Sequence, residues 1–399
     1  MLPIEVDAGV HWIGVNERTL DLFEGLWPVV REGVSYNAYL IEDESTAIID
    51  LSKGTKGGEF FDQVGHVTDV SAIDYVIINH LEPDHAGLLA TLRALNPGVT
   101  IICAPNAKEM LETFYNVTKN VRAVRDGESL SLGRTELQFF HAPFIHWPET
   151  MVTYDTGRKI LFSCDAFGGY GALQGGLFDD ECGDLSFYER ESLRYYANIV
   201  AKFSKPVLQA IKKLGGLDIR MIAPSHGLVW RADPGRIVEL YRRWASYATG
   251  AAEPGITLVY GSMYGFTEQM MNAVAVGIRR TGVPLDIFDA GRAHVSYILP
   301  SLLAKSGVMI GAPTYEGALF PPVAQALGMA ATKSMTGKKV ARFGSYGWRG
   351  GAQRCAEKIF ESLKWELVES FEFCGKPSEA ELSMGIDFGA RFAEVIAAN

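Results

Sequence analysis

The alternation of hydrophobic and polar residues divides the chain into two regions with different periodicities. From Val10 to about Tyr247, short apolar runs typical of strands are interspersed with polar turns and helical patterns. The runs Ser35–Ile41 and Thr46–Ser52 flank a polar turn and predict a hairpin. Strands and helices in this mixed order indicate a layered α/β sandwich. Helical patterns are centred on residues 60–66, 88–95, 193–203 and 237–246.

The last third of the chain has a more regular pattern. The stretch Ala248–Gly255 is small, polar and ends in Pro-Gly, which is typical of a linker. From Ile256 onward, five strand-like runs alternate with helical patterns. This alternation predicts an open, parallel, doubly wound sheet. We therefore expect two domains, at residues 1–250 and 255–399.

Composition narrows the classes of protein to consider. The length of 399 residues favours two domains, and no run of about 18 apolar residues predicts a transmembrane helix. The amino terminus lacks the basic and apolar regions of a signal peptide. A net charge of -10 disfavours nucleic acid or an anionic membrane as partner. The five cysteines form no C-x-x-C pair, which excludes a rubredoxin module or zinc ribbon and favours a reduced, cytoplasmic location.

Metal-binding chemistry is concentrated in the segment from His80 to His85. Its sequence, H-L-E-P-D-H, closes the apolar run YVIINH and places four potential ligands within six residues. Three further candidates follow other strand-like runs: His146, Asp165 and His226. If these strands share sheets, their ends converge on one edge.

Four imidazoles and three carboxylates are too many ligands for one metal ion and suit two. A set without thiolate favours iron, manganese or zinc over copper(I). A carboxylate such as Asp165 can bridge two cations, and two metals roughly 3.5–4 Å apart can hold a diatomic ligand between them. Cys164 precedes Asp165, but side chains alternate along a strand, so we expect its thiol to point the other way.

The second region carries a phosphate-binding pattern. The strand Ile256–Gly261 runs into the loop Ser262–Glu268 and then a helix. Free backbone N–H groups, hydroxyls and the positive end of a helix bind phosphate at such a turn. The loop has no lysine, which argues against a P-loop and favours a flavodoxin-type site for FMN. The predicted FMN contacts here are Ser262, Met263, Tyr264, Gly265, Phe266 and Thr267.

Two later loops follow the third and fourth predicted strands of this region. Both come at strand carboxyl ends, where ligands bind in such sheets. Their aromatic side chains offer flat faces, and their glycines allow the backbone to approach a flavin ring closely. The predicted contacts are Pro313, Thr314, Tyr315, Glu316, Gly317, Ser345, Tyr346, Gly347, Trp348, Arg349 and Gly350.

These motifs together resemble those of flavodiiron proteins. H-x-E-x-D-H, a lone histidine before Trp-Pro, an aspartate and Ser-His-Gly are similar to their metallo-β-lactamase-like domain. Hydrolases of that superfamily usually show H-x-H-x-D-H, and Glu82 in place of the second histidine shifts the preference from zinc toward iron. YGSMYGFTE, GAPTYEG and GSYGWRGGA are similar to the flavodoxin domain of the same family. The resemblance covers nearly the whole chain and implies an α/β protein, a metallo-β-lactamase-like αββα sandwich followed by a flavodoxin-like doubly wound parallel sheet.

The resemblance also implies roles for the ligands. His80, Glu82 and His146 would hold one iron ion. Asp84, His85 and His226 would hold the other, with Asp165 as the bridge. A tyrosine of the segment Arg194–Val200 reaches the surroundings of the diiron site in this family, which makes Tyr195 a candidate catalytic residue.

The implied activity is reduction of dioxygen to water or of nitric oxide to nitrous oxide, with FMN and two non-haem iron ions as cofactors. Such proteins form head-to-tail dimers, so a homodimer or a dimer of dimers is expected. The donor must be a separate partner: rubredoxin or another small electron carrier, or the reduced deazaflavin coenzyme that the loop Gly168–Gly176 suggests.

Two alternatives remain open from the sequence. One is a dizinc hydrolase fused to a flavodoxin electron carrier, and the other is a pure electron carrier whose first domain is a scaffold. The sequence decides neither the preferred gas, nor the donor, nor the reduction potentials.

Overall fold

The computed structural model describes residues 2–248, 250 and 252–398. They form two compact units. The first unit runs to Tyr196 and resumes with Lys205–Arg242, and the second comprises Ala197–Ser204 and the chain from Arg243 onward. The predicted linker Ala248–Gly255 contains Thr249 and Ala251, which lie outside the described residues. The domain limits 1–250 and 255–399 therefore remain a proposal.

Two sheets make up the first unit. The seven-stranded sheet has the order β1-β2-β7-β8-β9-β10-β11, and its strands are parallel from β8 to β11. The five-stranded sheet has the order β12-β13-β14-β15-β16 and is antiparallel except for β15 and β16. The strands of the first sheet are β1 (Ile4–Asp7), β2 (Val10–Trp12), β7 (Tyr39–Ile41), β8 (Ala47–Ile49), β9 (Tyr75–Ile77), β10 (Thr100–Cys103) and β11 (Val121–Ala123). Those of the second are β12 (Ser129–Ser131), β13 (Glu136–His141), β14 (Met151–Asp155), β15 (Ile160–Cys164) and β16 (Met221–Pro224).

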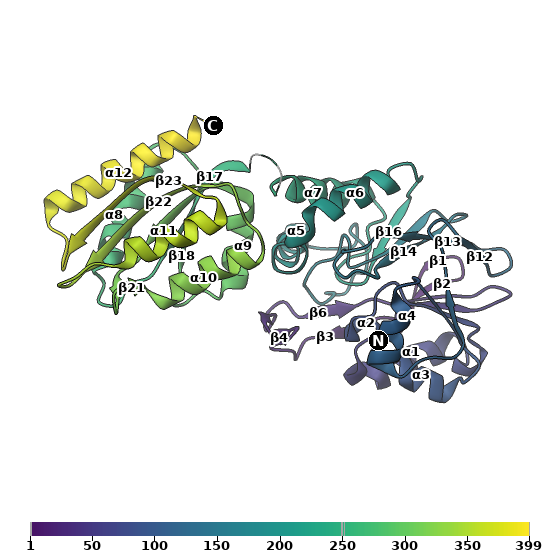
Figure 1. The fold of residues 1–399 in the computed structure, drawn as a ribbon. Coiled ribbons are helices and arrows are strands. Elements are labelled where there is room, and N and C mark those ends of the chain that lie inside the picture. The colour runs from purple at the N-terminus through teal and green to yellow at the C-terminus, as the bar shows by residue number, and fades with distance from the viewer. Residues whose placement is uncertain (1, 249, 251, 399) are drawn as a thin grey trace. The chain divides into compact units, whose positions relative to one another are not determined.

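The core of the first unit lies between these two sheets. Apolar side chains from both sheets form one buried cluster, and the rings of Tyr39 and Phe162 lie 5.1 Å apart across it. Burying apolar surface on both inner faces is what holds two sheets together. Helices cover the outer faces, which completes the predicted αββα sandwich (Figure 1). They are α1 (Gly57–Val67), α2 (Pro83–Ala86), α3 (Leu89–Leu95), α4 (Ala107–Tyr115), α5 (Leu185–Tyr195), α6 (Ser204–Leu214) and α7 (Pro234–Ser246).

Two local features before residue 205 differ from the sequence prediction. The predicted hairpin is present as β7 and β8, but Val34–Tyr36 forms a separate strand, β6, paired with β3 (Val15–Glu17). The predicted helix 193–203 is not one α-helix. It consists of the end of α5, a π-helix at Tyr196–Val200 and a 3₁₀-helix at Ala201–Phe203. The short strands β4 (Leu22–Phe23) and β5 (Trp27–Pro28) form a further pair, and 3₁₀-helices lie at Gly54–Lys56 and Val70–Ala72.

The second unit has the predicted parallel sheet. Its order is β18-β17-β19-β22-β23, and every neighbouring pair is parallel. This is the 2-1-3-4-5 order of flavodoxin-like folds, in which ligands bind at the carboxyl ends of the strands. The strands are β17 (Glu253–Tyr260), β18 (Leu285–Asp289), β19 (Lys305–Gly311), β22 (Lys339–Tyr346) and β23 (Glu366–Cys374), with a hairpin of β20 (Thr314–Tyr315) and β21 (Ala318–Leu319). The helices are α8 (Phe266–Arg280), α9 (Val295–Ala304), α10 (Pro321–Thr332), α11 (Ala352–Leu363) and α12 (Glu379–Ala397).

The first strand of this sheet begins earlier than predicted. β17 starts at Glu253 and includes Pro254 and Gly255, with a shift in its register against β19 between Glu253 and Ile256. A bulge of this kind accommodates proline inside a strand. No helix among the described residues has the length and apolar character needed to cross a bilayer.

Candidate functional site

The predicted metal-ligating side chains come together around Asp165. Four belong to the segment after β9, where Glu82 precedes helix α2 and Asp84 and His85 lie within it. The remaining three come from the second sheet: His146 from the loop between β13 and β14, Asp165 directly after β15, and His226 shortly after β16. The strands that carry the cluster belong to two different sheets, and the side chains that follow their ends meet in one place.

Asp165 lies between two groups of ligands. Its Oδ2 is 3.5 Å from Nε2 of His80 and 3.5 Å from Nε2 of His146. Its Oδ1 is 3.1 Å from Nε2 of His85 and 3.4 Å from Nε2 of His226. Each oxygen of one buried carboxylate thus faces a different pair of histidines.

The other two carboxylates complete one group each. Glu82 Oε2 lies 3.2 Å from Nε2 of His80 and 3.0 Å from Nε2 of His146. The two oxygens of Asp84 lie 3.4 Å from Nε2 of His85 and 3.4 Å from Nε2 of His226. The side chains predicted to hold two ions therefore form two groups, and Asp165 lies within 3.5 Å of histidines in both.

The residues present fit two metal ions. Ligand atoms about 2.1 Å from a common ion, at tetrahedral to octahedral angles, lie about 3.0–3.4 Å from one another. The separations within the two groups are 3.0–3.5 Å, close to this spacing. In addition, both oxygens of Asp84, both oxygens of Asp165 and Nε2 of His226 are buried and form no hydrogen bond with any described residue. Buried polar atoms without partners are rare, and cations at these two positions would satisfy all of them.

Two histidines are oriented by hydrogen bonds from their outer nitrogens. Nδ1 of His80 lies 2.8 Å from Oε1 of Glu149, and Nδ1 of His226 lies 2.7 Å from the carbonyl oxygen of Ser35. The carbonyl can only accept, so His226 carries its proton on Nδ1 and presents Nε2 to the cluster. Glu149 orients His80 in the same way and also accepts a hydrogen bond from the backbone N–H of Leu81.

The pKa values in the cluster reflect burial opposed by ion pairing. Burial lowers the pKa of His226, but Asp165 and Asp84 outweigh it and raise that pKa to about 10. Burial likewise opposes protonation of His80, yet Glu149 and Glu82 raise its pKa well above the usual value. Burial raises the pKa of Asp165, but His85 and His226 hold it well below its ordinary range. The carboxylates therefore favour positive charge at the very positions where cations would bind.

Replacing Glu149 by glutamine tests its orienting role. Loss of the carboxylate charge should weaken metal retention about 10-fold to 100-fold, the usual cost of removing such an outer partner. Metal content after dialysis against chelators of increasing strength measures this. Glu136→Gln, at an exposed position on β13, is the matched control. Equal retention in both variants would show that Glu149 does not support the site.

Aromatic rings enclose one side of the cluster. The rings of Phe23, Tyr36 and Tyr195 lie 5.5, 5.7 and 5.6 Å from the ring of His226. Trp147 lies 5.0 Å from the ring of His80. The predicted catalytic candidate Tyr195 is buried, and burial followed by the charge of Asp165 raises its pKa well above 10, so its hydroxyl stays protonated.

Cys164 lies closer to the cluster than strand alternation predicted. Its sulfur, a carboxylate oxygen of Asp50 and a ring nitrogen of His85 lie within 4.8 Å of one another. Cys164 has a positive φ of 56°, which departs from regular strand geometry. Burial raises the pKa of its thiol well above 9, and that of Asp50 to about 6. Cys164 is grouped with Asp50 and His85 and lies in neither of the two sets of side chains around Asp165.

Sequence reasoning missed the residues that support the cluster. Glu149 stands three residues after His146, and a search for carboxylates near each ligand could have found it. Ser35 acts through its backbone carbonyl, for which a sequence carries no signal. Phe23 and Tyr36, whose rings pack against His226, belong to a segment that is far in sequence from every proposed ligand.

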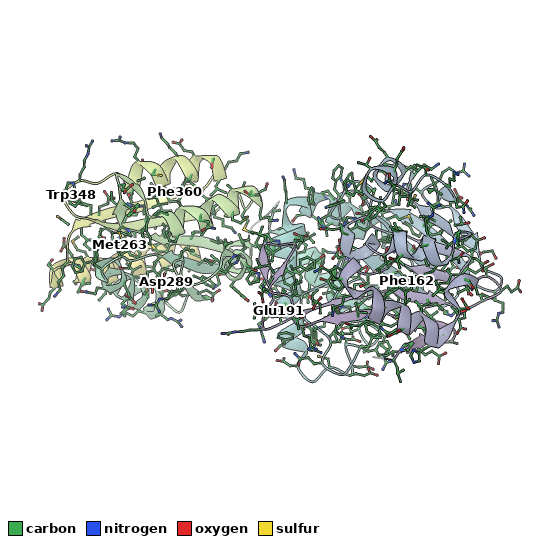
Figure 2. All side chains as sticks on the ribbon, turned by 90° about the horizontal axis from the view of Figure 1, so that it is seen from below. Phe162, Glu191, Met263, Asp289, Trp348 and Phe360 are labelled. Atoms are coloured by element: carbon green, nitrogen blue, oxygen red, sulfur yellow. The ribbon has the colours of Figure 1, made fainter. Side chains whose placement is uncertain are left out.

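A cavity of about 330 Å³ lies at the carboxyl ends of the strands in the second unit. Its size suits a cofactor ring system. Tyr264 and Trp348 at its rim are 79% and 96% exposed, and Figure 2 shows Trp348 at the margin of the unit. Thirteen of the predicted FMN contacts line this cavity: Ser262, Met263, Tyr264, Phe266, Thr267, Pro313, Thr314, Tyr315, Glu316, Ser345, Tyr346, Gly347 and Trp348.

The loop before α8 has the geometry expected of a phosphate site. Gly265 precedes the helix with φ +83°, a conformation that favours glycine. The hydroxyl of Ser262 accepts a hydrogen bond from the N–H of Gly265 at 3.1 Å, and the hydroxyls of Thr267 and Ser345 lie 2.8 Å apart. The loop thus gathers hydroxyls at a helix amino terminus, as an FMN phosphate requires.

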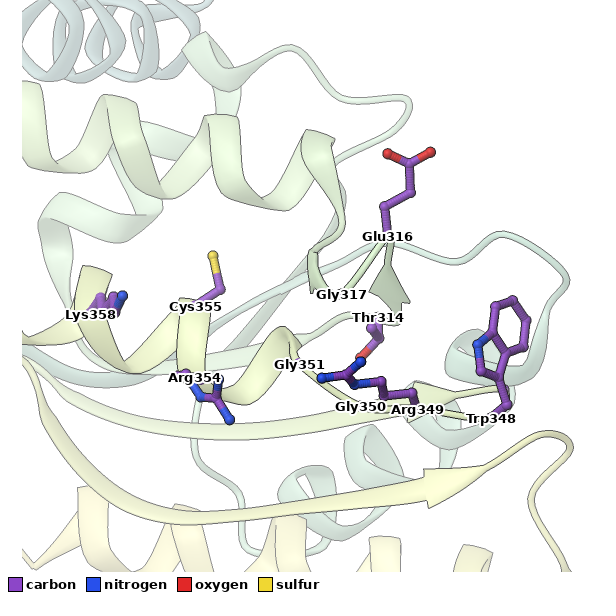
Figure 3. Close-up of a pocket in the computed structure, with 11 residues that line it drawn as sticks. Thr314, Glu316, Gly317, Trp348, Arg349, Gly350, Gly351, Arg354, Cys355 and Lys358 are labelled. Carbon is purple, nitrogen blue, oxygen red and sulfur yellow. The ribbon is translucent and has the colours of Figure 1, made fainter.

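The remaining four predicted contacts do not line this cavity but lie next to it, and they stay a prediction. Gly317, Arg349 and Gly350 line a neighbouring cavity (Figure 3), and Gly265 lies in the loop without lining the first one. Gly375, which follows β23, lines the first cavity and was not predicted.

Comparison with known proteins identifies a family for each of the two units. Residues 34–227 match the model of the ODP family beta lactamase, and residues 258–389 match that of flavodoxin. The chain is 34% identical to the anaerobic nitric oxide reductase flavorubredoxin of Escherichia coli O1:K1 / APEC, over 98% of this chain and 82% of that protein. It is also 34% identical to the nitric oxide reductase of Moorella thermoacetica, over 92% of this chain and 91% of that protein.

Solved structures show the same architecture. The rubredoxin oxygen:oxidoreductase of Desulfovibrio gigas has a TM-score of 0.94 at 28% identity, covering 99% of both chains. The flavodiiron protein of Giardia intestinalis has a TM-score of 0.94 at 28% identity, covering 100% of this chain and 97% of that one. With two fused domains, seven clustered imidazole and carboxylate side chains and relatives that align over nearly its whole length, this chain belongs to the flavodiiron protein family.

Proposed function

We propose that this chain reduces dioxygen to water, or nitric oxide to nitrous oxide, using two iron ions in the Asp165 cluster and FMN in the cavity of the second unit. The observation that carries the proposal is Asp165, whose two oxygens face two separate histidine pairs. The names of the relatives, nitric oxide reductase and rubredoxin oxygen:oxidoreductase, support the same two gases.

We assign one ion to His80, Glu82 and His146, and the other to Asp84, His85 and His226, with Asp165 shared. Glu82 supplies a hard oxygen ligand that favours iron over zinc. When bound, the two ferrous ions supply electrons and coordination positions for a diatomic gas, and FMN supplies two electrons that it can release one at a time.

The chain's carboxylates provide charge balance at this cluster. Glu82, Asp84 and Asp165 together carry three negative charges in a buried site, and such charges are stable in a protein interior only when paired. Asp165 places one oxygen toward each group and so reduces the repulsion between two close cations. Glu149 and the Ser35 carbonyl hold the protons of His80 and His226 on Nδ1, which leaves their Nε2 lone pairs free to bind metal.

Aromatic residues limit the access of water. Phe23, Tyr36 and Tyr195 pack against His226, and all three are buried. A water-poor site strengthens the electrostatic interactions inside it and protects reduced intermediates from side reactions. We assign Tyr195 two roles: its ring positions His226, and its protonated hydroxyl provides a donor near the cluster.

The FMN assignment rests on hydroxyls and backbone N–H groups. Ser262 and Thr267 stand at the amino terminus of α8, where the helix dipole favours an anion. Tyr264, Tyr315 and Trp348 provide aromatic surface along the cavity for the ring system.

We further propose the partners that the family suggests. The donor is rubredoxin or another small electron carrier, with the reduced deazaflavin coenzyme as the second choice. Tyr264 and Trp348 leave apolar surface exposed at the flavin cavity, and a head-to-tail homodimer or a dimer of dimers would cover it. All five cysteines are free, in keeping with a reduced, cytoplasmic location.

Replacing both His80 and His146 with alanine tests the proposed reactive site. The double variant should consume dioxygen and nitric oxide at least about 100-fold more slowly after photoreduction of its flavin, because one metal position loses two of its ligands. Gas electrodes measure the rates, and absorbance at 450 nm measures retained FMN. His11→Ala with His66→Ala, outside the cluster, is the control. Unchanged gas consumption would place the reaction away from the metal cluster and favour a pure electron carrier.

A further inference from the structure

A small cavity lies within the first unit, between the second sheet and the helices that cover its outer face. It leaves about 10 Å³ of free space for the centre of a water-sized sphere, which is room for about one small molecule. Its walls are β14, β15, the loops that follow β13 and β15, and helices α6 and α7, which lie beside this sheet in Figure 1. None of the proposed metal ligands or FMN contacts lines it.

The lining of this cavity is apolar. Nine of its twelve side chains are hydrophobic and none is charged. The other three belong to Thr150, Ser163 and Tyr241, and their hydroxyls donate hydrogen bonds to backbone carbonyl oxygens at 3.0, 2.7 and 2.7 Å. A buried water molecule needs two to four polar partners, and an apolar cavity without them stays dry. We therefore expect no ordered water in this cavity.

The cavity adjoins the metal cluster on the side of His146 and Asp165. Ile145 directly precedes His146, Ala166 directly follows Asp165, and both Ile145 and Ala166 line the cavity. Consecutive residues are at most about 3.8 Å apart at their Cα atoms, so the lining and the ligands are immediate neighbours. Ala210, on α6, is the one lining residue that is partly exposed. The cavity thus lies between α6 and the cluster.

We propose that this cavity binds one molecule of a small apolar gas and supplies it to the metal cluster. The inference rests on the proposed function, in which dioxygen or nitric oxide is the substrate. Such gases carry no charge and form at most weak hydrogen bonds, so a dry apolar cavity favours them over water and ions. Transfer from water into apolar surroundings enriches a molecule the size of one or two methylene groups about 4-fold to 15-fold.

Xenon is an apolar probe of similar size that tests the binding site directly. Crystals of the full-length protein equilibrated under xenon pressure should show an anomalous peak in the cavity, in contact with Val152 and Val207. Xenon needs neither iron nor FMN, so its binding does not depend on the proposed function. A cavity without xenon under pressure, or one filled by ordered water, would overturn the proposal.

Filling the cavity tests the supply of gas. Ala210→Leu extends a side chain into it from α6, and Ala142→Val does so from the loop after β13, which keeps the test available if one variant does not fold. Both should lose the xenon peak. Both should also lower kcat/KM for dioxygen and nitric oxide at least about 4-fold, the lower limit of the enrichment, with kcat at saturating gas unchanged. Gln209→Leu, at an exposed position on the same helix, is the matched control and should change neither measurement.

The same samples separate failure of this proposal from failure of the proposed function. Iron content and FMN absorbance should be equal in all the proteins, which shows that both cofactor sites are intact. Equal kcat/KM values in the filled variants and the control would overturn the supply of gas through this cavity, even where gas consumption itself is confirmed. If the unchanged protein, loaded with iron and FMN, consumed neither gas, the proposed function would be refuted, and xenon would still decide whether the cavity binds a gas.

Discussion

Replacing Asp165 with asparagine is expected to reduce bound iron from two ions per chain to one or fewer. Asparagine keeps the volume and one carbonyl oxygen, but it loses the negative charge and the second acceptor. Each oxygen of Asp165 faces its own histidine pair, and neither forms a hydrogen bond with a described residue. Without the shared carboxylate, the repulsion between two cations is no longer offset at that position. Gas consumption should fall at least about 100-fold, since a two-metal site needs both ions.

Iron analysis of the purified variant measures this effect, and absorbance at 450 nm shows whether FMN is retained. Asp218→Asn, which removes an exposed carboxylate of the same unit, is the control and should keep both ions. Two tightly bound iron ions in Asp165→Asn would mean that Asp165 is not the bridge. A circular dichroism spectrum equal to that of the control ensures that lost iron does not reflect an unfolded protein.

Replacing Thr267 with aspartate is expected to weaken FMN binding at least about 100-fold. Thr267 is buried at the start of α8, where its hydroxyl lies 2.8 Å from that of Ser345. Two like charges about 5 Å apart repel by about 3 kcal/mol at an effective dielectric constant of 20. A carboxylate at this position would oppose the phosphate that the loop is proposed to bind. Fluorescence titration of the apoprotein with FMN measures the change.

Thr267→Ser keeps the hydroxyl and is the matched control, with binding expected within about threefold of the unchanged protein. A second measurement does not depend on any variant. Riboflavin lacks the phosphate and should bind the unchanged protein at least about 100-fold more weakly than FMN, because the donors of the loop would lose their partner. Equal affinities for riboflavin and FMN would show that the loop does not hold a phosphate.

The convergence of the seven imidazole and carboxylate side chains could be predicted from the sequence because its signals are local. H-L-E-P-D-H places four potential ligands within six residues, and the apolar run before it marks a strand end. The structure brings these side chains together with His146, Asp165 and His226. It also shows that two sheets contribute. Periodicity identifies strands but carries little information on which strands pair.

The parallel sheet of the second unit was also predictable, since regular alternation of strands and helices permits few topologies. The loops of this sheet were less predictable than its strands and helices. Arg349 and Gly350 were expected at the flavin together with Trp348, and they line a cavity that adjoins the proposed FMN cavity and shares Trp348 with it. A sequence places residues on a loop, whereas backbone geometry decides which side of the loop each one faces.

Other features depend on contacts between distant segments. The helix predicted at residues 193–203 is broken by a π-helix at Tyr196–Val200, and helical periodicity alone does not reveal such an interruption. The bond between His226 and the Ser35 carbonyl joins residues 191 positions apart through a backbone atom. No pattern of side chains along the sequence predicts this hydrogen bond, because its acceptor is a backbone atom.

Anomalous diffraction from crystals grown anaerobically with iron, recorded on both sides of the iron absorption edge, tests the central claim most directly. The account predicts two iron peaks per chain, about 3.5–4 Å apart, on opposite sides of the Asp165 carboxylate. One peak should contact His80, Glu82 and His146, and the other Asp84, His85 and His226. A single iron position, peaks only at the zinc edge, or iron held away from Asp165 would contradict it.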